Sequence, residues 1–461
     1  MKDLTQGPIT RHLIALAVPI AVGMLFQTLY FVVDLYFVSR LGPAAIAGVS
    51  SAGTAGFVIL GLTQMLGVGT VALVAQAAGR KDQKAANLVF NQSVLLSALC
   101  GVVTLLAGWL LATPYMRWMT ADTASARAGS EYLLAYTPGL ALQFALVALS
   151  SALRGTGIVR PTMLVQMVTV LLNIVLAPVL IAGWGTHHPL GPLGAGLASS
   201  LAIAVGVALL WVYFARLEHY VGLEAVLLHP DAPSIRRILN IGLPAGGEFF
   251  MLSIILGVVY VVIRAFGPAA QAGFGIGGRV MQALFLPVMA LAFAATPLAG
   301  QNFGARHYAR VRATFRQAAL LSSVLMLLLT LLCQLRPDVF IRIFSRQGDV
   351  VAVGADYLRV ISWNFIASGL IFTCSGLFQA LGYTWPSLLS SGARLLTFVL
   401  PALWLASRPQ FQLREVWYLS VTSVTLQALM SLLLLRREFA RRLPRPPLGS
   451  VADPQAPEAP A

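Results

Sequence analysis

The sequence is poor in charged residues. Asp, Glu, Lys and Arg make up only 10% of its 461 residues, whereas 58% are hydrophobic, and soluble proteins average about 25% charged residues. A chain with so few charges cannot cover its surface with them, so lipid must be its main solvent. Basic residues outnumber acidic ones by 31 to 16, but they lie in short clusters between apolar runs. This pattern argues against nucleic acid as a partner and is typical of membrane-protein loops.

Cysteines and catalytic motifs are also scarce. The three cysteines, Cys100, Cys333 and Cys374, lie inside apolar runs without a CxxC or Cys/His spacing, so we interpret them as core residues rather than metal ligands or disulfide partners. The sequence contains no GxxxxGK[ST], HExxH or GxSxG motif. The chain is therefore predicted not to be an enzyme and to need no cofactor. Any uphill transport would be driven by an ion gradient.

Long apolar runs are what the sequence does have. A membrane helix needs about 20 mostly apolar residues, and the pattern predicts an all-α polytopic membrane protein with twelve transmembrane helices. Prolines inside six of these spans are expected to interrupt or kink them: Pro19, Pro138, Pro178, Pro244, Pro287 and Pro401. The predicted spans are 12–39, 48–77, 86–112, 130–153, 161–183, 193–215, 238–265, 273–299, 314–335, 355–380, 386–407 and 414–436.

The two halves of the chain repeat each other at a constant offset of 225 residues. "LGPAAIAG" in the first half matches "FGPAAQAG" in the second, and further pairs are Pro19 with Pro244, Gln76 with Gln301, Gly79 with Gly304, and Pro161 with Pro386. A constant offset indicates internal duplication. Because each half holds six spans, an even number, the second half enters the membrane in the same orientation, as in parallel repeats. The predicted units are an N-lobe (1–225), a C-lobe (226–437) and a basic, Pro-rich, disordered cytoplasmic tail (438–461).

The loop charges predict the orientation. If the N-terminus is cytoplasmic, 19 of the 31 Lys and Arg residues fall on the inner side. This bias predicts that both termini lie in the cytoplasm. We expect a multi-pass protein of the bacterial inner membrane.

A polar stripe marks the first span. Gly23, Gln27, Tyr30 and Asp34 are spaced 4, 3 and 4 apart, which places them on one helical face. A charge at the bilayer centre costs about 2.5–3.5 kcal/mol on insertion scales, so such a stripe must face the bundle interior or a wet cavity. Asp34 either serves packing, hydrogen-bonded to Tyr30 or a neighbour, or forms an ion or proton site. We favour the second interpretation.

Other polar residues lie within the remaining spans. Asn173 in the fifth span follows Gln166 by seven residues and either bonds across to another helix or contributes to a site. Glu248 follows Pro244 by four residues, whereas Asp34 follows the matching Pro19 by fifteen, so the two acids differ in depth by about 16 Å. Arg394 lies mid-span and either lines a cavity or snorkels. The candidate substrate-cavity residues are Gln64, Glu248, Met281, Gln282, Met289, Asn364 and Arg394.

Several stretches together resemble the multidrug and toxic compound extrusion (MATE) family over residues 4–437. They are the opening "LTQGPITRHLIALAVPIAVGMLFQTLYFVVDLYFVSRLGPAAIAGVS", then "VAQAAGRKD", "ALRGTGIVRPTM" and "GLPAG". The resemblance implies two six-helix lobes around a V-shaped cavity. It also implies export of amphipathic, often cationic, drugs or metabolites against inward H+ or Na+. In the DinF-like branch the first-span aspartate, here Asp34, is the ion-coupling group, and Gln27, Tyr30 and Asn173 match its neighbours.

The chain departs from the family pattern in two places. Many relatives have an acid in the fifth span where this chain has Ala177. The loss of this second carboxylate favours H+ coupling but leaves open a Na+ site at Asp34 and Asn173. Another branch has an acid deeper in the seventh span and one in the tenth. In this chain Glu248 lies about one turn earlier in the seventh span and the tenth span has no acid, so the cation site of that branch is not transferred. A lipid-linked precursor flippase is the alternative function. Such proteins usually need several cationic groups deep in the cavity to bind a pyrophosphate, and Arg394 is the only clear mid-span arginine in this sequence. A passive channel or scaffold is a third class. The chain is expected to be a monomer.

Overall fold

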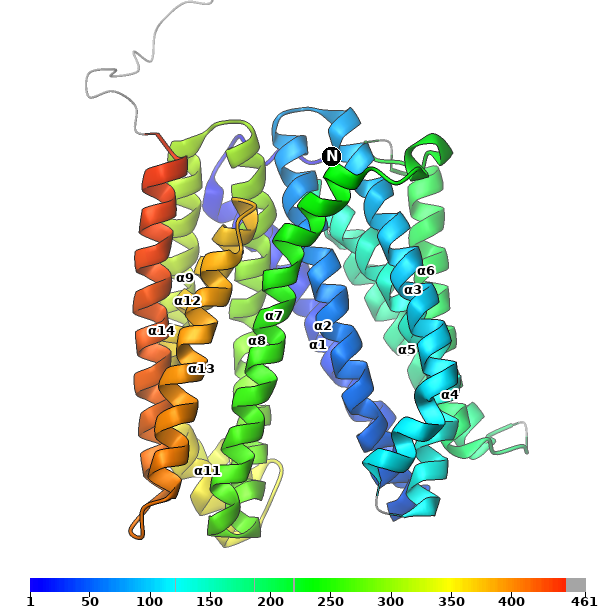
Figure 1. Ribbon diagram of the computed structural model, residues 1–461, viewed down its shortest axis with the longest axis vertical. Coiled ribbons are helices and arrows are strands. Elements are labelled where there is room, and N and C mark those ends of the chain that lie inside the picture. The colour runs from blue at the N-terminus through cyan, green and yellow to red at the C-terminus, as the bar shows by residue number, and fades with distance from the viewer. Residues whose placement is uncertain (121, 186, 219, 445–461) are drawn as a thin grey trace, which may run out of the picture.

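The computed structural model describes residues 1–120, 122–185, 187–218 and 220–444, apart from the side chains of Phe31 and Leu35. Within these ranges it consists of helices, with no strand (Figure 1). The first half contains α1 (Ile9–Ser39), α2 (Pro43–Gly79), α3 (Gln83–Met119), α4 (Thr123–Gly155), α5 (Arg160–Ala182) and α6 (Gly191–Arg216). The second half contains α7 (Ala232–Ile263), α8 (Pro268–Gly304), α9 (Tyr308–Leu335), α10 (Pro337–Arg342), α11 (Gly348–Ile361), α12 (Asn364–Ala380), α13 (Trp385–Ala406) and α14 (Leu413–Arg442).

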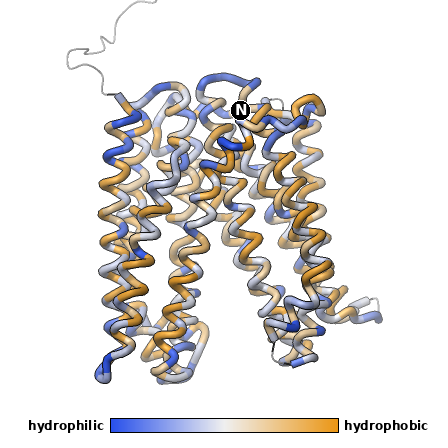
Figure 2. The backbone as a smooth tube through the Cα atoms, viewed as in Figure 1, coloured by the Kyte–Doolittle hydropathy of each residue, from blue (hydrophilic) through white to orange (hydrophobic). Residues whose placement is uncertain are grey.

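Eleven of the described helices are long and apolar enough to cross a membrane, and the count is twelve when α11 and α12 form one bent span. Figure 2 shows hydrophobic residues along the length of the bundle and hydrophilic residues gathered at its two ends. The prediction of an all-α, multi-pass membrane protein with twelve spans is therefore confirmed. The short helix α10 and the single-turn 3-10 helices η1 (Ala225–Leu228) and η2 (Arg264–Phe266) were not predicted.

The tenth span differs from its prediction as one helix over 355–380. It breaks between α11 and α12, which meet at 58°. Gln334 of α9 donates to the Arg359 carbonyl at 2.6 Å, and Thr330 of the same helix donates to the Ser362 carbonyl at 2.9 Å. These bonds satisfy backbone acceptors at the bend. No proline lies there, whereas α1, α4, α5, α7, α8 and α13 each run on through the internal proline that was expected to interrupt them.

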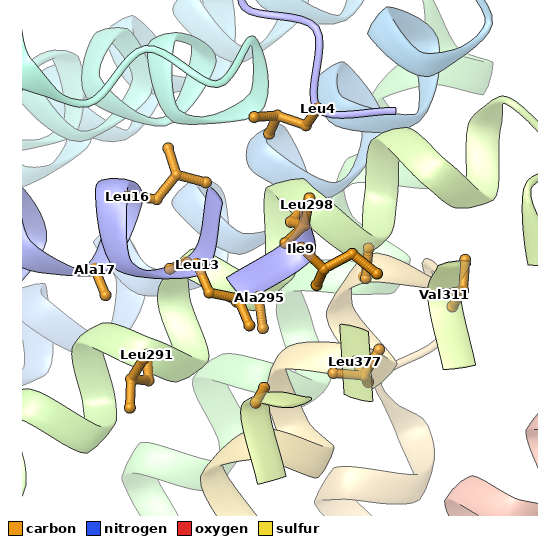
Figure 3. Packing of buried hydrophobic residues seen from close by; sticks show 14 of the residues in the cluster. Leu4, Ile9, Leu13, Leu16, Ala17, Leu291, Ala295, Leu298, Val311 and Leu377 are labelled. Carbon is orange, nitrogen blue, oxygen red and sulfur yellow. The ribbon is translucent and has the colours of Figure 1, made fainter. Parts of the chain in front are cut away.

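The start of each half's first helix packs against the other half. We call the end of the bundle that carries the N-terminus and the end of α14 the terminal face (Figure 1). On this side, the start of α1 packs Leu13 and Ala17 in one cluster with Ala295 and Leu298 of α8 (Figure 3). The repeat-related α7 packs in the same way in a cluster with residues of α2.

Two glycines set the closest approach of the halves. A Cβ added to Gly79 of α2 would lie 1.9 Å from the carbonyl oxygen of Gln301, and one added to Gly304 of α8 would lie 2.0 Å from that of Gln76. The two glutamines bond symmetrically as well. Gln76 donates to the Ala380 carbonyl at 2.8 Å, and Gln301 donates to the Gly155 carbonyl at 3.1 Å. Every residue in these pairs has its mate 225 positions away, so the parallel repeat extends to individual hydrogen bonds.

Away from this crossing the two halves diverge toward the opposite face (Figure 1). The first half of α2 shows the change, because Phe57 and Val58 are exposed and a Cβ added to Gly53 would meet nothing within 4 Å. The helices are therefore closed together at the terminal face and separated at the other end.

The segment that connects the halves is held by side chains of α3. Asn91 accepts from the Glu224 backbone N–H at 3.0 Å and donates to the Gly222 carbonyl at 2.9 Å. Gln92 donates to the carbonyls of Leu227 and His229, each at 2.7 Å. The predicted lobe boundary between 225 and 226 falls in this segment and stays a prediction. The predicted tail begins too early, since α14 runs to Arg442; residues 445–461 lie outside the described part of the chain.

Candidate functional site

The polar stripe of α1 faces the interior of the N-lobe. Leu25, Leu29, Val32 and Tyr36 are between 43% and 60% exposed and form the opposite, outer face of the helix. Asp34, by contrast, is only 8% exposed. The structure therefore places this carboxylate inside the first lobe, where the spacing of the stripe predicts it to lie.

Asp34 has no cationic partner within the described part of the chain. Its Oδ1 atom is buried and accepts no hydrogen bond. Its electrostatic neighbours are the phenols of Tyr30, Tyr132 and Tyr136, and the rings of Tyr132 and Tyr136 lie 5.5 Å apart. A buried, unpaired carboxylate is costly while it is charged, so the site favours binding of a proton or a small cation.

A serine of α6 links the predicted coupling residues. The hydroxyl of Tyr30 donates to Ser199 Oγ at 2.5 Å, and the Asn173 side-chain nitrogen lies 3.5 Å from the same atom. Asn173 is fully buried and its Oδ1 has no partner. Ser199 was missed by the sequence analysis; its signal is the "SS" pair in the otherwise apolar "GLASSLAIA". Gln27 is half-buried and forms no hydrogen bond with the described residues.

Gly23 lets α1 and α5 approach. A Cβ at this position would lie 3.0 Å from Gln166 Oε1, so the absent side chain makes room for the amide. Two residues of the fifth-span stripe, Gln166 and Asn173, thus lie against the first-span stripe.

Ala177 is fully buried and packs in an apolar cluster with Val38 and Ile181. Glu131 is the only other acid in α1 to α6, and it bonds Arg127 at 2.9 Å on the protein surface. Nothing among the described residues of these helices therefore replaces the second carboxylate. Asp34 is the single buried acid within the described residues of helices α1 to α6.

The C-lobe contains a second buried carboxylate. Ser375 of α12 donates to Glu248 Oε2 at 3.5 Å and receives a hydrogen bond from Ser387 of α13 at 3.1 Å. Glu248 as a whole is half-buried, yet its Oε1 is buried without a partner. Hydroxyl donors rather than a cation therefore surround this acid.

The remaining predicted cavity residues form no hydrogen bond or ion pair with Asp34 or Glu248 among the described residues. Met281 lies with its sulfur 3.8 Å from the Tyr357 hydroxyl, and the buried Asn364 has an unpartnered Oδ1. Arg394 is half-buried with an unpartnered Nε. Gln64 and Met289 are half-buried and Gln282 is exposed. The described residues contain no group of three His, Cys, Asp or Glu side chains able to hold a metal ion.

Comparisons with known proteins agree with this architecture. The chain is 27% identical over 403 residues to the probable multidrug resistance protein NorM of Thermotoga maritima, covering 87% of this chain and 84% of the relative. It is 24% identical over 392 residues to the multidrug export protein MepA of Staphylococcus aureus, and the match covers 83% of this chain and 85% of the relative. A solved MOP superfamily transporter from Pyrococcus furiosus has a TM-score of 0.87 and 25% identity, with 95% of this chain and 98% of that one covered.

A second solved structure is an outward-facing multidrug resistance MATE transporter with a TM-score of 0.89 and 24% identity. The match covers 96% of this chain and 98% of the solved chain, and it supports the fold alone. The assignment to the DinF-like branch stays a prediction. The model of the MatE family matches residues 19–179 and 244–404, two segments separated by the same 225 residues as the repeat. Both halves of the chain therefore carry the family's signature, and the protein belongs to the MatE family of membrane transporters.

Proposed function

We propose that the protein is a secondary multidrug antiporter, which exports amphipathic, cationic compounds in exchange for protons. The relatives named as multidrug export and resistance proteins support the export of drugs. The observation that carries the coupling is Asp34, a carboxylate buried inside the N-lobe without a cation among the described residues.

Binding of a proton at Asp34 removes the charge whose burial is costly. The Tyr30, Ser199 and Asn173 contacts connect α1 with α5 and α6, so a change at Asp34 reaches three helices. Substrate and proton must favour opposite access states for exchange to occur. The protonated form favours one packing of α1 and the ionised form favours another.

H+ is favoured over Na+ because Asp34 is the single carboxylate buried among the described residues of α1 to α6. Ala177 leaves the site without a second acid, and a site of several negative oxygen ligands suits a metal cation better. We place both termini in the cytoplasm of a bacterial inner membrane and treat the monomer as the transporting unit. Asp34 then takes its proton from the outer side.

Transport of a cationic dye in proteoliposomes tests this function. A pH gradient and a Na+ gradient are imposed separately on vesicles that contain the wild type, Asp34→Asn or Glu131→Gln. We expect the pH gradient alone to drive uptake by the wild type and by Glu131→Gln, whereas Asp34→Asn inserts and folds but loses gradient-driven transport. Uptake driven only by Na+ would reassign the ion, and normal coupled transport by Asp34→Asn would remove Asp34 from the mechanism.

A further inference from the structure

Arg394 lies on the inner face of α13. The exposed leucines of this helix, Leu389, Leu396, Leu400 and Leu403, are spaced 7, 4 and 3 apart and form its outer face. Ser387, Ser391, Arg394 and Phe398 are spaced 4, 3 and 4 apart and form the opposite face. Phe398 is 1% exposed and belongs to the central C-lobe cluster. The guanidinium therefore belongs to the interior of the lobe and does not snorkel to the membrane surface.

No anion of the described chain neutralises Arg394. Its Nε is buried without a hydrogen-bond partner, and the phenol of Tyr357 is the group with which it interacts electrostatically. The acid of this lobe, Glu248, lies with Ser375 and Ser387 instead. Ser387 is seven residues before Arg394, which is about 10 Å along the helix. An arginine inside a membrane lobe is costly unless it is paired or wet.

A second unpartnered donor borders the same tyrosine. The indole Nε1 of Trp417 in α14 is buried and donates to nothing described. The Trp417 ring lies 4.8 Å from the ring of Tyr357 and stacks on Phe274 at 5.7 Å. Two donor-only groups, one of them positively charged, thus lie beside Tyr357. The acid next to it in the chain, Asp356, is paired with Arg414 of α14 at 2.6 Å.

The N-lobe has the reverse chemistry at the equivalent place. Tyr357 is the repeat mate of Tyr132, 225 residues earlier, and Tyr132 interacts with Asp34. The unpartnered groups of that lobe include two acceptors, Asp34 Oδ1 and Asn173 Oδ1. The duplicated scaffold therefore places an unpartnered carboxylate oxygen near a tyrosine in one lobe and an unpartnered guanidinium nitrogen near the repeat-related tyrosine in the other.

We propose that the C-lobe holds a binding site for the anionic group of a transported amphipath, with Arg394 and Trp417 as its donors. Guanidinium groups bind carboxylates through charge-assisted hydrogen bonds. The inference rests on the proposed export function and deepens it: the preferred substrates carry a carboxylate in addition to their cationic, apolar part.

A matched pair of dyes tests the site by equilibrium binding without any gradient. Rhodamine B carries a free carboxylate at pH 7, and its ethyl ester differs only in masking that group. Fluorescence anisotropy with the purified full chain measures both affinities. We expect Arg394→Gln to weaken rhodamine B binding at least about tenfold while the ester changes less than about twofold. Arg264→Gln, at an exposed arginine after α7, serves as the control and leaves both affinities unchanged.

Two further variants separate recognition from folding. Trp417→Phe keeps the aromatic packing but removes the N–H, and we expect it to weaken rhodamine B binding several-fold with the ester unaffected. Arg394→Lys keeps the charge and should retain part of the preference for the carboxylate. Equal losses for both dyes, or no loss for either, would overturn the site, and these two variants decide the question if Arg394→Gln does not fold. Because no gradient is used, a failure here is distinct from a failure of proton coupling at Asp34.

Discussion

At the scale of single residues, Ser199 shows how one hydroxyl can join three helices. Its Oγ accepts from Tyr30 of α1 and lies beside Asn173 of α5, and the residue is fully buried. Spacing along α1 was enough to predict the Tyr30 and Asp34 face, because a helix has a fixed period. It could not reveal Ser199, since that contact depends on how α6 packs against α1 and α5. The roles of these residues in coupling stay a prediction.

Replacement of Ser199 by alanine tests this junction. Ser199→Ala removes the hydrogen bond from the Tyr30 hydroxyl to Ser199 Oγ, and loss of a buried hydrogen-bond partner costs about 1–3 kcal/mol. We expect lower thermal stability together with a shifted pH dependence of dye transport. The neighbouring Ser200→Ala is the matched control: Ser200 binds Ala135 O and Gly139 N of α4 instead. It should lose stability but keep the wild-type pH profile. Identical pH profiles for both variants would show that Ser199 has no special link to Asp34.

At the scale of helices, the sequence predicts the number of spans well because apolar length is a local property. It fails at the α11–α12 bend, where the cause lies on another helix. "VISWNF" contains neither proline nor glycine, and the bend is stabilised by Gln334 and Thr330 of α9. The prolines do not interrupt their helices, since a membrane helix tolerates an internal proline when neighbouring groups satisfy the freed backbone; the expected kinks stay a prediction.

Gln334→Leu tests whether α9 stabilises this bend. The change leaves the carbonyl of Arg359 and the hydroxyl of Ser362 without the Gln334 donor. We expect a loss of about 1–3 kcal/mol in unfolding free energy, seen as a lower melting temperature of the purified protein. Gln282→Leu, at an exposed glutamine of α8, is the matched control. If both variants melt like the wild type, the side-chain bonds do not maintain the bend.

The α2–α8 crossing depends on a missing side chain. In Gly79→Ala the new Cβ would meet the Gln301 backbone at 1.9 Å, so the two helices must separate. Overpacking of this kind costs about 1–3 kcal/mol, and Gly304→Ala should behave in the same way because it is the repeat mate. Gly53→Ala, in open space on α2, should be neutral or slightly stabilising. Thermal unfolding of the three variants checks this order, which a tolerated Gly79→Ala would contradict.

At the scale of the whole molecule, the connection between the halves is part of the structure rather than a loose tether. Gln92 of α3 is fully buried and, besides its two donated bonds, accepts from the Asp231 N–H at 2.9 Å. We expect Gln92→Leu to free the connecting segment and to expose it to a Glu-specific protease at Glu218 and Glu224. The control Ser97→Ala removes only a bond within α3. Limited proteolysis followed by mass spectrometry measures the rate, and equal rates in the two variants would refute the clamp.

The N-terminal segment joins the two lobes across the terminal face. Leu4 is fully buried; its N–H donates to Gln301 Oε1 at 3.0 Å, and its carbonyl accepts from Asn302 at 3.2 Å. Lys2 donates through its backbone to the Thr156 carbonyl of the first half at 2.8 Å. The segment thus contacts α8 of one half and the end of α4 in the other. Rocking of the lobes, which the proposed antiport needs, would open the terminal face and break these contacts.

Removal of residues 2–7 should therefore shift the protein toward a state open at the terminal face. The measurement is the labelling rate of a single cysteine, Leu298→Cys, by a membrane-impermeant maleimide after replacement of the three native cysteines. Leu298 of α8 is fully buried in the cluster that α8 forms with the start of α1 (Figure 3). We expect labelling about tenfold faster in the truncated protein, equivalent to about 1.4 kcal/mol of lost closure. Leu358→Cys, fully buried inside the C-lobe, must stay protected in both proteins, because faster labelling there would indicate unfolding. Equal rates at position 298 would mean that the α2–α8 crossing closes this face without the N-terminal segment.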